Sequence, residues 1–190
     1  MKKTNISFDR EQNLVYKEFA PGRDIFFNNE ITCLKILKEN FEKKYYNIYP
    51  FPVLKKINYS NLSFSMSYCG NTIDEQHDKG IINNIEIQLE NIFYNLKKNN
   101  ILYKDIHPSN ICINNNTIYI IDFEVAFIMD YEKYDGVITF ERKGYKWSEK
   151  FYNQYYVKPA DLNVYDKLNF ENEKRDWKGK PWSIHRMCII

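Results

Sequence analysis

Glycine is scarce in this chain of 190 residues, and the first of its six glycines is Gly22. The amino-terminal segment therefore lacks a glycine-rich turn, whose backbone amides are a common way of cradling a phosphate group. Either a phosphate-covering loop is absent near this end, or its backbone amides are replaced by some other short turn.

Cysteine is also sparse: the four residues Cys33, Cys69, Cys112 and Cys188 are scattered, with no Cys-x-x-Cys motif and no Cys/His pairing. This spacing argues against a zinc site and against a disulfide framework. Because Cys33 and Cys112 lie within apolar patterns, we expect them to be buried thiols in a reducing compartment.

Long apolar runs and strong net charge are missing as well. No run is long enough to span a bilayer, which favours a soluble, cytoplasmic or otherwise intracellular protein, acting in its own or a host cell. A net charge of +2 gives no reason to expect nucleic acid or an anionic membrane as partner, and the short basic stretches Lys43-Lys44 and Arg142-Lys143 are typical of solvated faces. With 44% hydrophobic and 17% aromatic residues, the chain can bury the core of one compact unit.

Three polar side chains follow a spacing that suits metal-assisted phosphate chemistry. Asp105 and Asn110 are five residues apart, and Asp122 follows twelve residues later, at the end of an apolar segment. Between them, residues 111–113 and 117–121 predict two strands, and Asn114-Asn115-Asn116 predicts the turn that joins them. Such a hairpin would bring Asp122 back to Asn110, so that both could offer oxygen ligands to Mg²⁺.

The passage resembles the catalytic and metal-binding loops of the protein-kinase superfamily, whose pattern is His-Arg-Asp, four residues, Asn, and later Asp-Phe-Gly. Tyr103 stands at the His position, which is largely structural in the family, and His107 replaces the loop lysine. Glu124 replaces the Gly after Asp-Phe, which suggests a loop without the usual in/out flip. Pro108 favours a rigid loop over residues 105–110 instead of the start of a helix.

The resemblance implies an α+β, two-lobed fold in one kinase domain. Residues 1–70 would form a reduced antiparallel N-lobe with one main helix, and residues 71–190 a truncated, mostly helical C-lobe. It also implies roles: Asp105 as catalytic base, Asn110 and Asp122 as ligands of Mg²⁺ or Mn²⁺ with bound ATP, and His107 as a group that reaches the transferred phosphoryl.

Upstream, residues 13–19 predict a strand in which Val15 and Lys17 share one face. Residues 28–38 carry apolar side chains at helical spacing and predict an amphipathic helix with Glu30 in its first turn. In the family a strand lysine binds the α- and β-phosphates and is oriented by a helix glutamate, which implies these roles for Lys17 and Glu30. An ordinary first-turn acid and a solvated lysine are the alternatives.

Residues 51–57 and 62–68 predict two further strands, and the apolar periodicity of residues 81–99 predicts a helix that leads into the 103–110 loop. By chain order, the backbone of Ser67, Tyr68 and Cys69 would form the hinge that binds an adenine; a plain junction between strand and loop is the alternative. Farther on, Glu149 and Asp161 resemble the glutamate that closes the family's activation region and its buried helix-start aspartate, with Arg186 as the favoured partner of Glu149.

The sequence therefore predicts an ATP-dependent protein kinase that phosphorylates a Ser, Thr or Tyr hydroxyl of a protein. Two alternatives stay open. The absence of a glycine-rich loop and the presence of Glu124 favour a pseudokinase that binds or scaffolds without catalysis. The pair His107-Pro108 is typical of small-molecule kinases of the aminoglycoside and choline kinase type, although those usually devote long inserted helices to their substrates.

Overall fold

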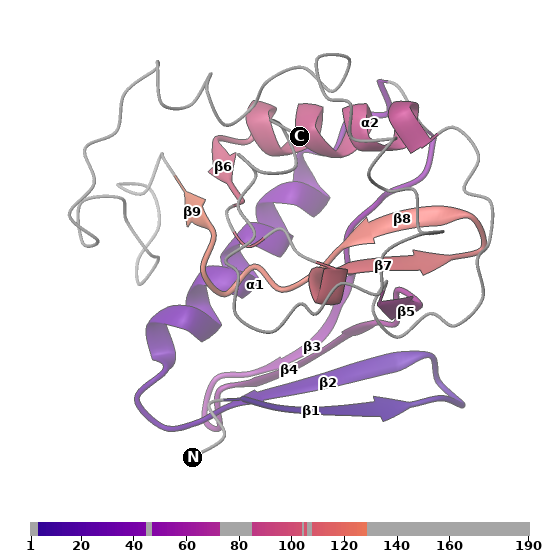
Figure 1. Ribbon diagram of the computed structural model, residues 1–190. Helices are drawn as coiled ribbons and strands as arrows, with labels where there is room; N and C mark the ends of the chain where they lie inside the picture. Colours follow the sequence, from indigo (N-terminus) through magenta and orange to yellow (C-terminus); the bar gives the residue numbers. More distant parts are fainter. Residues whose placement is uncertain (1–3, 45–46, 73–84, 104, 106–107, 129–190) are drawn as a thin grey trace.

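The computed structural model describes residues 4–44, 47–72, 85–103, 105 and 108–128, and this part of the chain is a mixed α+β structure with antiparallel sheets and two α-helices (Figure 1). The α+β class expected from the sequence is thereby confirmed. In chain order the elements are β1 (Thr4–Asp9), β2 (Leu14–Phe19), α1 (Asp24–Glu39), β3 (Leu54–Asn58), β4 (Ser63–Ser67), β5 (Asn71–Thr72), α2 (Ile85–Lys98), β6 (Ile101–Leu102), the 3-10 turn η1 (Pro108–Asn110), β7 (Ile111–Asn114), β8 (Thr117–Ile120) and β9 (Phe127–Ile128).

The first sheet has the strand order β1-β2-β4-β3, and all its pairings are antiparallel. It confirms the three strands predicted around residues 13–19, 51–57 and 62–68, with shorter bounds. Along β2, Val15, Lys17 and Phe19 alternate inward as expected and are all buried. The other two sheets, β5-β7-β8 and β6-β9, are built from later residues, and the division into two lobes at residue 70 remains a prediction.

Helix α1 begins at Asp24, four residues earlier than the sequence pattern indicated. A turn sets this start: the Arg23 amide donates to the Ala20 carbonyl at 3.1 Å, and Gly22 has a φ of +83°, which glycine adopts without strain. Glu30 consequently lies in the second turn of α1 and is fully buried, so the prediction of a first-turn position was wrong. A helix dipole acting on an exposed first-turn acid therefore does not explain this glutamate.

The β7–β8 hairpin matches its sequence signal closely. Asn114 pairs with Thr117, and the two residues between them, Asn115 and Asn116, have φ values of 46° and 63°. Two consecutive left-handed residues are what a type I′ hairpin turn requires, and asparagine tolerates that region better than most residues. The hairpin is thus encoded locally.

Helix α2 covers this hairpin and ends as its sequence predicted, with Lys97 and Lys98 in the last turn. The Asn100 amide donates to the Lys97 carbonyl at 3.0 Å with a left-handed φ of 53° at Asn100, which closes the helix. Residues 81–84 of the predicted helix lie outside the described part. In Figure 1, α1 runs from the first sheet toward α2, so one apolar core joins both helices and the sheets.

Gly70 lies where the first sheet ends and the second begins. It has a φ of +97°, and a Cβ atom there would overlap the carbonyl of Ile113 on β7. Only glycine allows the chain to pass this close to a neighbouring strand. The junction between β4 and β5 is therefore held tightly against β7.

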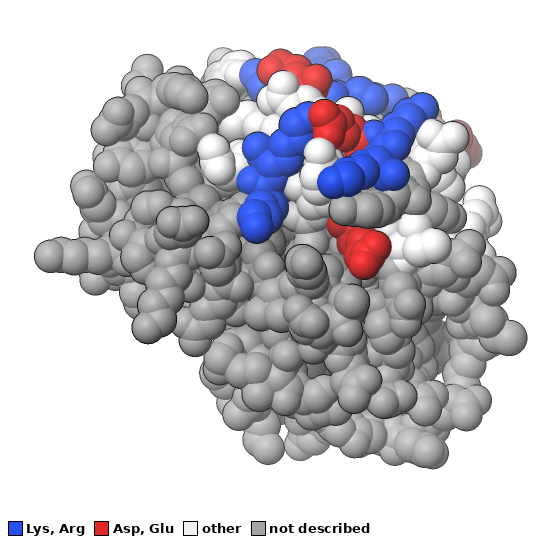
Figure 2. Space-filling model, turned by 90° about the horizontal axis from the view of Figure 1, so that it is seen from above, with Lys and Arg blue, Asp and Glu red and all other residues white. Residues whose placement is uncertain are grey.

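The described surface carries charges of both signs. Seen from above (Figure 2), Lys and Arg side chains lie among acidic ones, and Lys98 forms an ion pair with Glu42. Lys43 and Lys44 are exposed, as expected for a solvated stretch. Cys33, Cys69 and Cys112 are buried thiols, as predicted for the first and third, whereas Cys188 and residues 142–143 lie outside the described range. Neither helix seen in this part of the chain has the length and apolar character needed to cross a bilayer.

Candidate functional site

The ammonium group of Lys17 lies between two carboxylates that come from distant parts of the chain. Its Nζ is 2.6 Å from Glu30 on α1 and 2.8 Å from Asp122, which follows β8. Lys17 is only 3% exposed, and Glu30 is fully buried. The structure thus brings together three of the residues selected from the sequence, from β2, α1 and the segment after β8.

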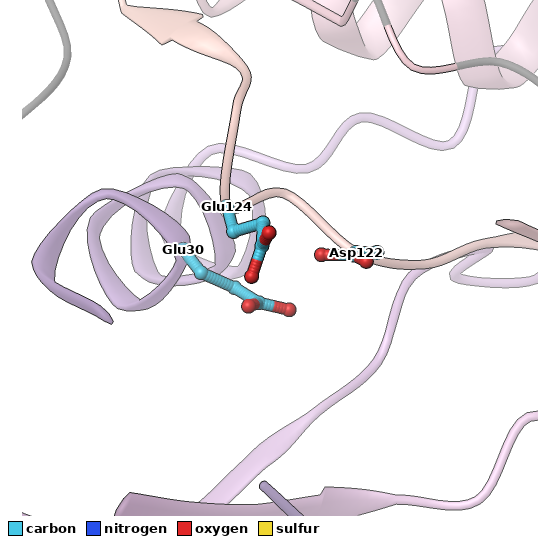
Figure 3. Close-up of side chains that lie close together, drawn as sticks. All are labelled: Glu30, Asp122 and Glu124. Carbon is cyan, nitrogen blue, oxygen red and sulfur yellow. The ribbon is translucent and has the colours of Figure 1, made fainter. Parts of the chain in front are cut away.

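Glu124 adds a third carboxylate to this group, at 3.8 Å from the Lys17 ammonium. It also forms an ion pair with Arg23 at 3.0 Å. Figure 3 shows the carboxylates of Glu30, Asp122 and Glu124 converging from α1 and from the segment after β8. Three carboxylates therefore share two cations, which leaves an excess of negative charge in a largely buried place.

Burial and the surrounding charges together raise the pKa of Glu30 and of Lys17. Burial raises the pKa of Glu30 to about 7, because the attraction of Lys17 only partly offsets the loss of solvent and Asp122 and Glu124 add repulsion. Burial alone would lower the pKa of Lys17, but Glu30 and Asp122 together raise it above its ordinary value. Glu30 Oε1 is buried and has no hydrogen-bond partner, so one oxygen of this glutamate is uncompensated.

Asp105 and Asn110 are joined directly. The Asn110 side-chain nitrogen donates to the Asp105 carbonyl at 2.9 Å and to its carboxylate Oδ2 at 3.1 Å. Asn110 belongs to the single 3-10 turn η1, so residues 108–110 do not begin an α-helix, as expected. The Ile121 amide donates to the Asn110 carbonyl at 3.0 Å, and this bond places Asp122 beside the 105–110 loop.

Asp122 has a φ of +62°, in the left-handed region that a non-glycine residue occupies at a cost. The conformation turns the chain after β8 so that the carboxylate meets Lys17 while Phe123 enters the core, where it is fully buried. Strained backbone of this kind persists only where surrounding contacts hold it. Asp122 is therefore placed by tertiary structure.

Tyr103 contacts the backbone and the side chain on either side of Asp122. Its hydroxyl donates to the Ile121 carbonyl at 2.6 Å, and its ring lies edge-on to Phe123, with centroids 5.0 Å apart. Burial raises the pKa of the Tyr103 hydroxyl well above its ordinary value, so that it remains a donor. Tyr103 is therefore part of the packing that holds the backbone before Asp122.

The residues fit a divalent cation in chemical type. Glu30, Asp122 and Glu124 each offer an oxygen within 4.8 Å of the others, and carboxylate and amide oxygens suit Mg²⁺ and Mn²⁺. The Lys17 ammonium already lies among these three carboxylates. Asn110 directs its side-chain nitrogen to Asp105, which leaves its side-chain oxygen as the possible ligand atom.

Hydrogen bonds within the first sheet already use part of the expected hinge. The Ser67 amide donates to the Val53 carbonyl and the Tyr68 amide to the Asn13 carbonyl, both at 2.9 Å. An adenine could therefore meet carbonyl groups and the backbone of Cys69 here, but not the amides of Ser67 and Tyr68. The hinge assignment itself remains a prediction.

Sequence reasoning missed three residues that shape the site: Arg23, Asn29, and Glu124 as a partner of Lys17. Asn29 is fully buried next to Glu30, and its amide contacts the backbone after Asp122. Nothing in the pattern of residues 28–38 distinguishes Asn29 from its neighbour Asn28, because its partners lie more than ninety residues away. Glu124 was noted only for the glycine that it replaces.

His107, Glu149, Asp161 and Arg186 lie outside the described residues, and their expected roles stay predictions. Comparison of the sequence with protein-family models and with curated proteins gave no match.

Proposed function

We propose that this protein is a phosphotransferase of the protein-kinase type, with a reduced two-lobed fold, that uses ATP and Mg²⁺ or Mn²⁺. The observation that carries the proposal is the buried Lys17 ammonium between Glu30 and Asp122, beside a loop in which Asn110 orients Asp105. The resemblance implied that a helix glutamate orients the strand lysine; the contact of Lys17 with Asp122 was not predicted and comes from the structure.

The roles of the residues follow from this arrangement. Lys17, steadied by Glu30, would neutralise the phosphates of the nucleotide, and Asp122 with Asn110 would hold the metal. A bound divalent cation supplies neutralisation of the charge on the transferred phosphoryl group. Asp105 would take the proton of the acceptor hydroxyl, since its carboxylate is half-buried and oriented by Asn110.

A protein hydroxyl is the acceptor that we favour. Small-molecule kinases usually surround their substrates with long inserted helices, and the α-helices of the described residues are α1 and α2 alone. Transfer to Ser, Thr or Tyr breaks the bond between the γ-phosphorus and the β-phosphate oxygen, forms one to the hydroxyl oxygen, and leaves the hydroxyl proton on Asp105.

A nucleotide-binding module without transfer is the second candidate, and Glu124 favours it. Its carboxylate lies 3.8 Å from the Lys17 ammonium, which would otherwise be available to stabilise the charge of a phosphate. An additional negative charge at this distance weakens phosphate binding unless Arg23 or a metal offsets it.

Two measurements separate the candidates. Thermal shift with ATP, with and without Mg²⁺, tests binding, and incubation of a cell extract with γ-labelled ATP tests transfer to protein. We expect wild type to show both and Asp105→Asn to lose transfer while keeping the thermal shift. Asp24→Asn, the same change at an exposed position in α1, is the matched control.

A thermal shift without any labelled protein would support the binding module instead. Label found in small molecules would point to a metabolite kinase. The absence of both a shift and transfer would overturn the proposal.

A further inference from the structure

One amide side chain of α1 grips the backbone that follows Asp122. Asn29 Nδ2 donates to the carbonyls of Phe123 and Ala126, each at 2.9 Å, and lies 3.3 Å from the carbonyl of Glu124. Asn29 is fully buried. Because an amide nitrogen carries only two protons, the two short bonds are the principal ones.

Charged contacts hold the same stretch, residues 122–126, which we call the Asp122 segment. Arg23, just before α1, pairs with Glu124 at 3.0 Å, and Lys17 on β2 contacts Asp122 at 2.8 Å. Within the segment, the Ala126 amide donates to the Phe123 carbonyl at 3.1 Å and closes a turn. The side of the segment that faces α1 is thus bound at nearly every residue.

We propose that Asn29 is a positioning residue that, together with the Arg23–Glu124 ion pair, clamps the Asp122 segment to α1 and so keeps Asp122 beside Lys17. In this view Glu124, which stands where the kinase pattern has glycine, is an anchor for the segment. The site is then assembled in the resting protein, without a movement of the helix or of the segment. The clamp itself does not depend on the proposed function; its consequence for catalysis does.

Movement of the Asp122 segment away from α1 would be costly. Asp122 is held at a φ of +62°, a conformation that needs contacts from outside to persist. Departure of the segment would leave the fully buried Asn29 amide without its acceptors, and a buried donor without a partner is costly. It would also take Glu124 away from Arg23. A state in which the segment has left α1 is therefore higher in free energy, because both Asn29 and the Arg23–Glu124 pair lose their partners.

Reactivity of Lys17 reports on the clamp without any nucleotide. N-acetylsuccinimide would be added to the native protein, and acetylation of Lys17 would be measured by mass spectrometry against exposed Lys55 in the same sample. We expect Asn29→Leu to raise the ratio of Lys17 to Lys55 acetylation by about tenfold. An apolar side chain of similar size cannot donate to the carbonyls of the segment, so the segment moves away and exposes Lys17 to the reagent without the Asp122 carboxylate beside it. Asn28→Leu, one residue away in the same helix and half-buried, is the matched control and should change the ratio less than twofold.

A gentler pair of variants covers the case in which Asn29→Leu does not fold. Arg23→Gln removes the ion pair with Glu124, together with the contacts of the guanidinium with the rings of Phe19 and Phe26, and should raise the ratio by about two- to threefold. Arg10→Gln on the exposed β1–β2 turn should leave the ratio unchanged. Hydrogen exchange of residues 123–126 should accelerate in Asn29→Leu and Arg23→Gln but not in their controls.

Equal Lys17 reactivity and equal exchange in each variant and its control would overturn the clamp. Because neither readout needs ATP, that result is distinct from a failure of phosphotransfer in the wild-type protein. If transfer occurs, the clamp also predicts that Asn29→Leu lowers kcat more than it raises the KM for ATP, since it displaces Asp122 and leaves the nucleotide contacts of β2 in place.

Discussion

The two helices bury polar side chains in contrasting ways. On α2, Gln88 accepts from the Ile118 amide at 2.8 Å and donates to the Asn116 carbonyl at 2.9 Å, so that one neutral side chain holds the β7–β8 hairpin. Asn95 does the same for the 41–44 stretch, accepting from the Glu42 amide at 2.8 Å and donating to its carbonyl at 3.0 Å. On α1 the buried polar side chains are those of Asn29 and the ionisable Glu30. Glu30 belongs to a cluster that has more carboxylates than cations.

The difference distinguishes side chains that stabilise the structure from side chains that belong to the proposed site. Neutral amides that satisfy loop backbones stabilise the structure at any pH. A largely buried cluster in which three carboxylates share two cations, Lys17 and Arg23, is costly, and charged groups perturbed in this way concentrate at functional sites. We infer that Gln88 and Asn95 on α2 are structural, and that the cluster around Lys17, which includes Glu30 on α1, is the part of the molecule that the proposed function would use. Four experiments test this comparison.

Removal of the cation should have the largest effect. Lys17→Met leaves Glu30 and Asp122 without their shared partner, and we expect a loss of about 3–5 kcal/mol in the free energy of unfolding. Urea unfolding at pH 7.5 measures it, with Lys55→Met on the exposed side of β3 as control. Adding Glu30→Gln to Lys17→Met should recover part of the loss. Equal unfolding midpoints for Lys17→Met and the control would refute the account of the cluster.

Removal of a scaffold amide should cost less. Gln88→Leu removes the side chain that bonds the Ile118 amide and the Asn116 carbonyl, and we expect the free energy of unfolding to fall by about 2 kcal/mol. The loss should be the same at pH 5 and pH 8, because no charge is involved. Ile87→Gln, at an exposed neighbouring position, should stay within about 0.5 kcal/mol of wild type. A loss for Gln88→Leu that varied strongly with pH would break the contrast between the helices.

The cluster, unlike the amides, should make stability depend on pH. The pKa of Glu30 is raised from 4.5 to about 7 in the folded protein, so the folded state binds this proton more tightly than the unfolded chain between these values. The free energy of unfolding should therefore fall as pH rises from 4.5 to 7, by on the order of 2 kcal/mol relative to Glu30→Gln. Unfolding of both proteins in the presence of a chelator tests this, and parallel pH curves would contradict it.

The smallest expected effect is a gain. Asn91, on the same helix as Gln88 and Asn95, is fully buried, and among the described residues neither polar atom of its side chain has a hydrogen-bond partner. Asn91→Leu should raise the free energy of unfolding by about 1 kcal/mol, because it replaces a buried, unsatisfied polar side chain with an apolar one of similar size. Destabilisation by this variant in a thermal melt would mean that Asn91 is part of the scaffold after all.

Local elements were predictable because their signals are local. The alternation around Val15 and Lys17, the periodicity of α2 and the asparagine turn at residues 114–116 each depend on neighbours in the sequence, and the structure confirms all three. The start of α1 was missed because the turn at Gly22, and not the apolar pattern, sets it. The contacts of Asn29 and Arg23 with residues 123–126 could not be predicted, since no spacing links positions about a hundred residues apart.

The sequence by itself determined which residues could do the chemistry: the spacing of Asp105, Asn110 and Asp122, and the inward face of β2 that carries Lys17. Only the tertiary structure decided that Lys17 is shared among Glu30, Asp122 and Glu124, and that Asn29 holds the segment behind them. The reason is physical. Strand, turn and helix patterns arise from interactions within a few residues, whereas the charge balance of a buried cluster depends on every side chain that folding brings to it.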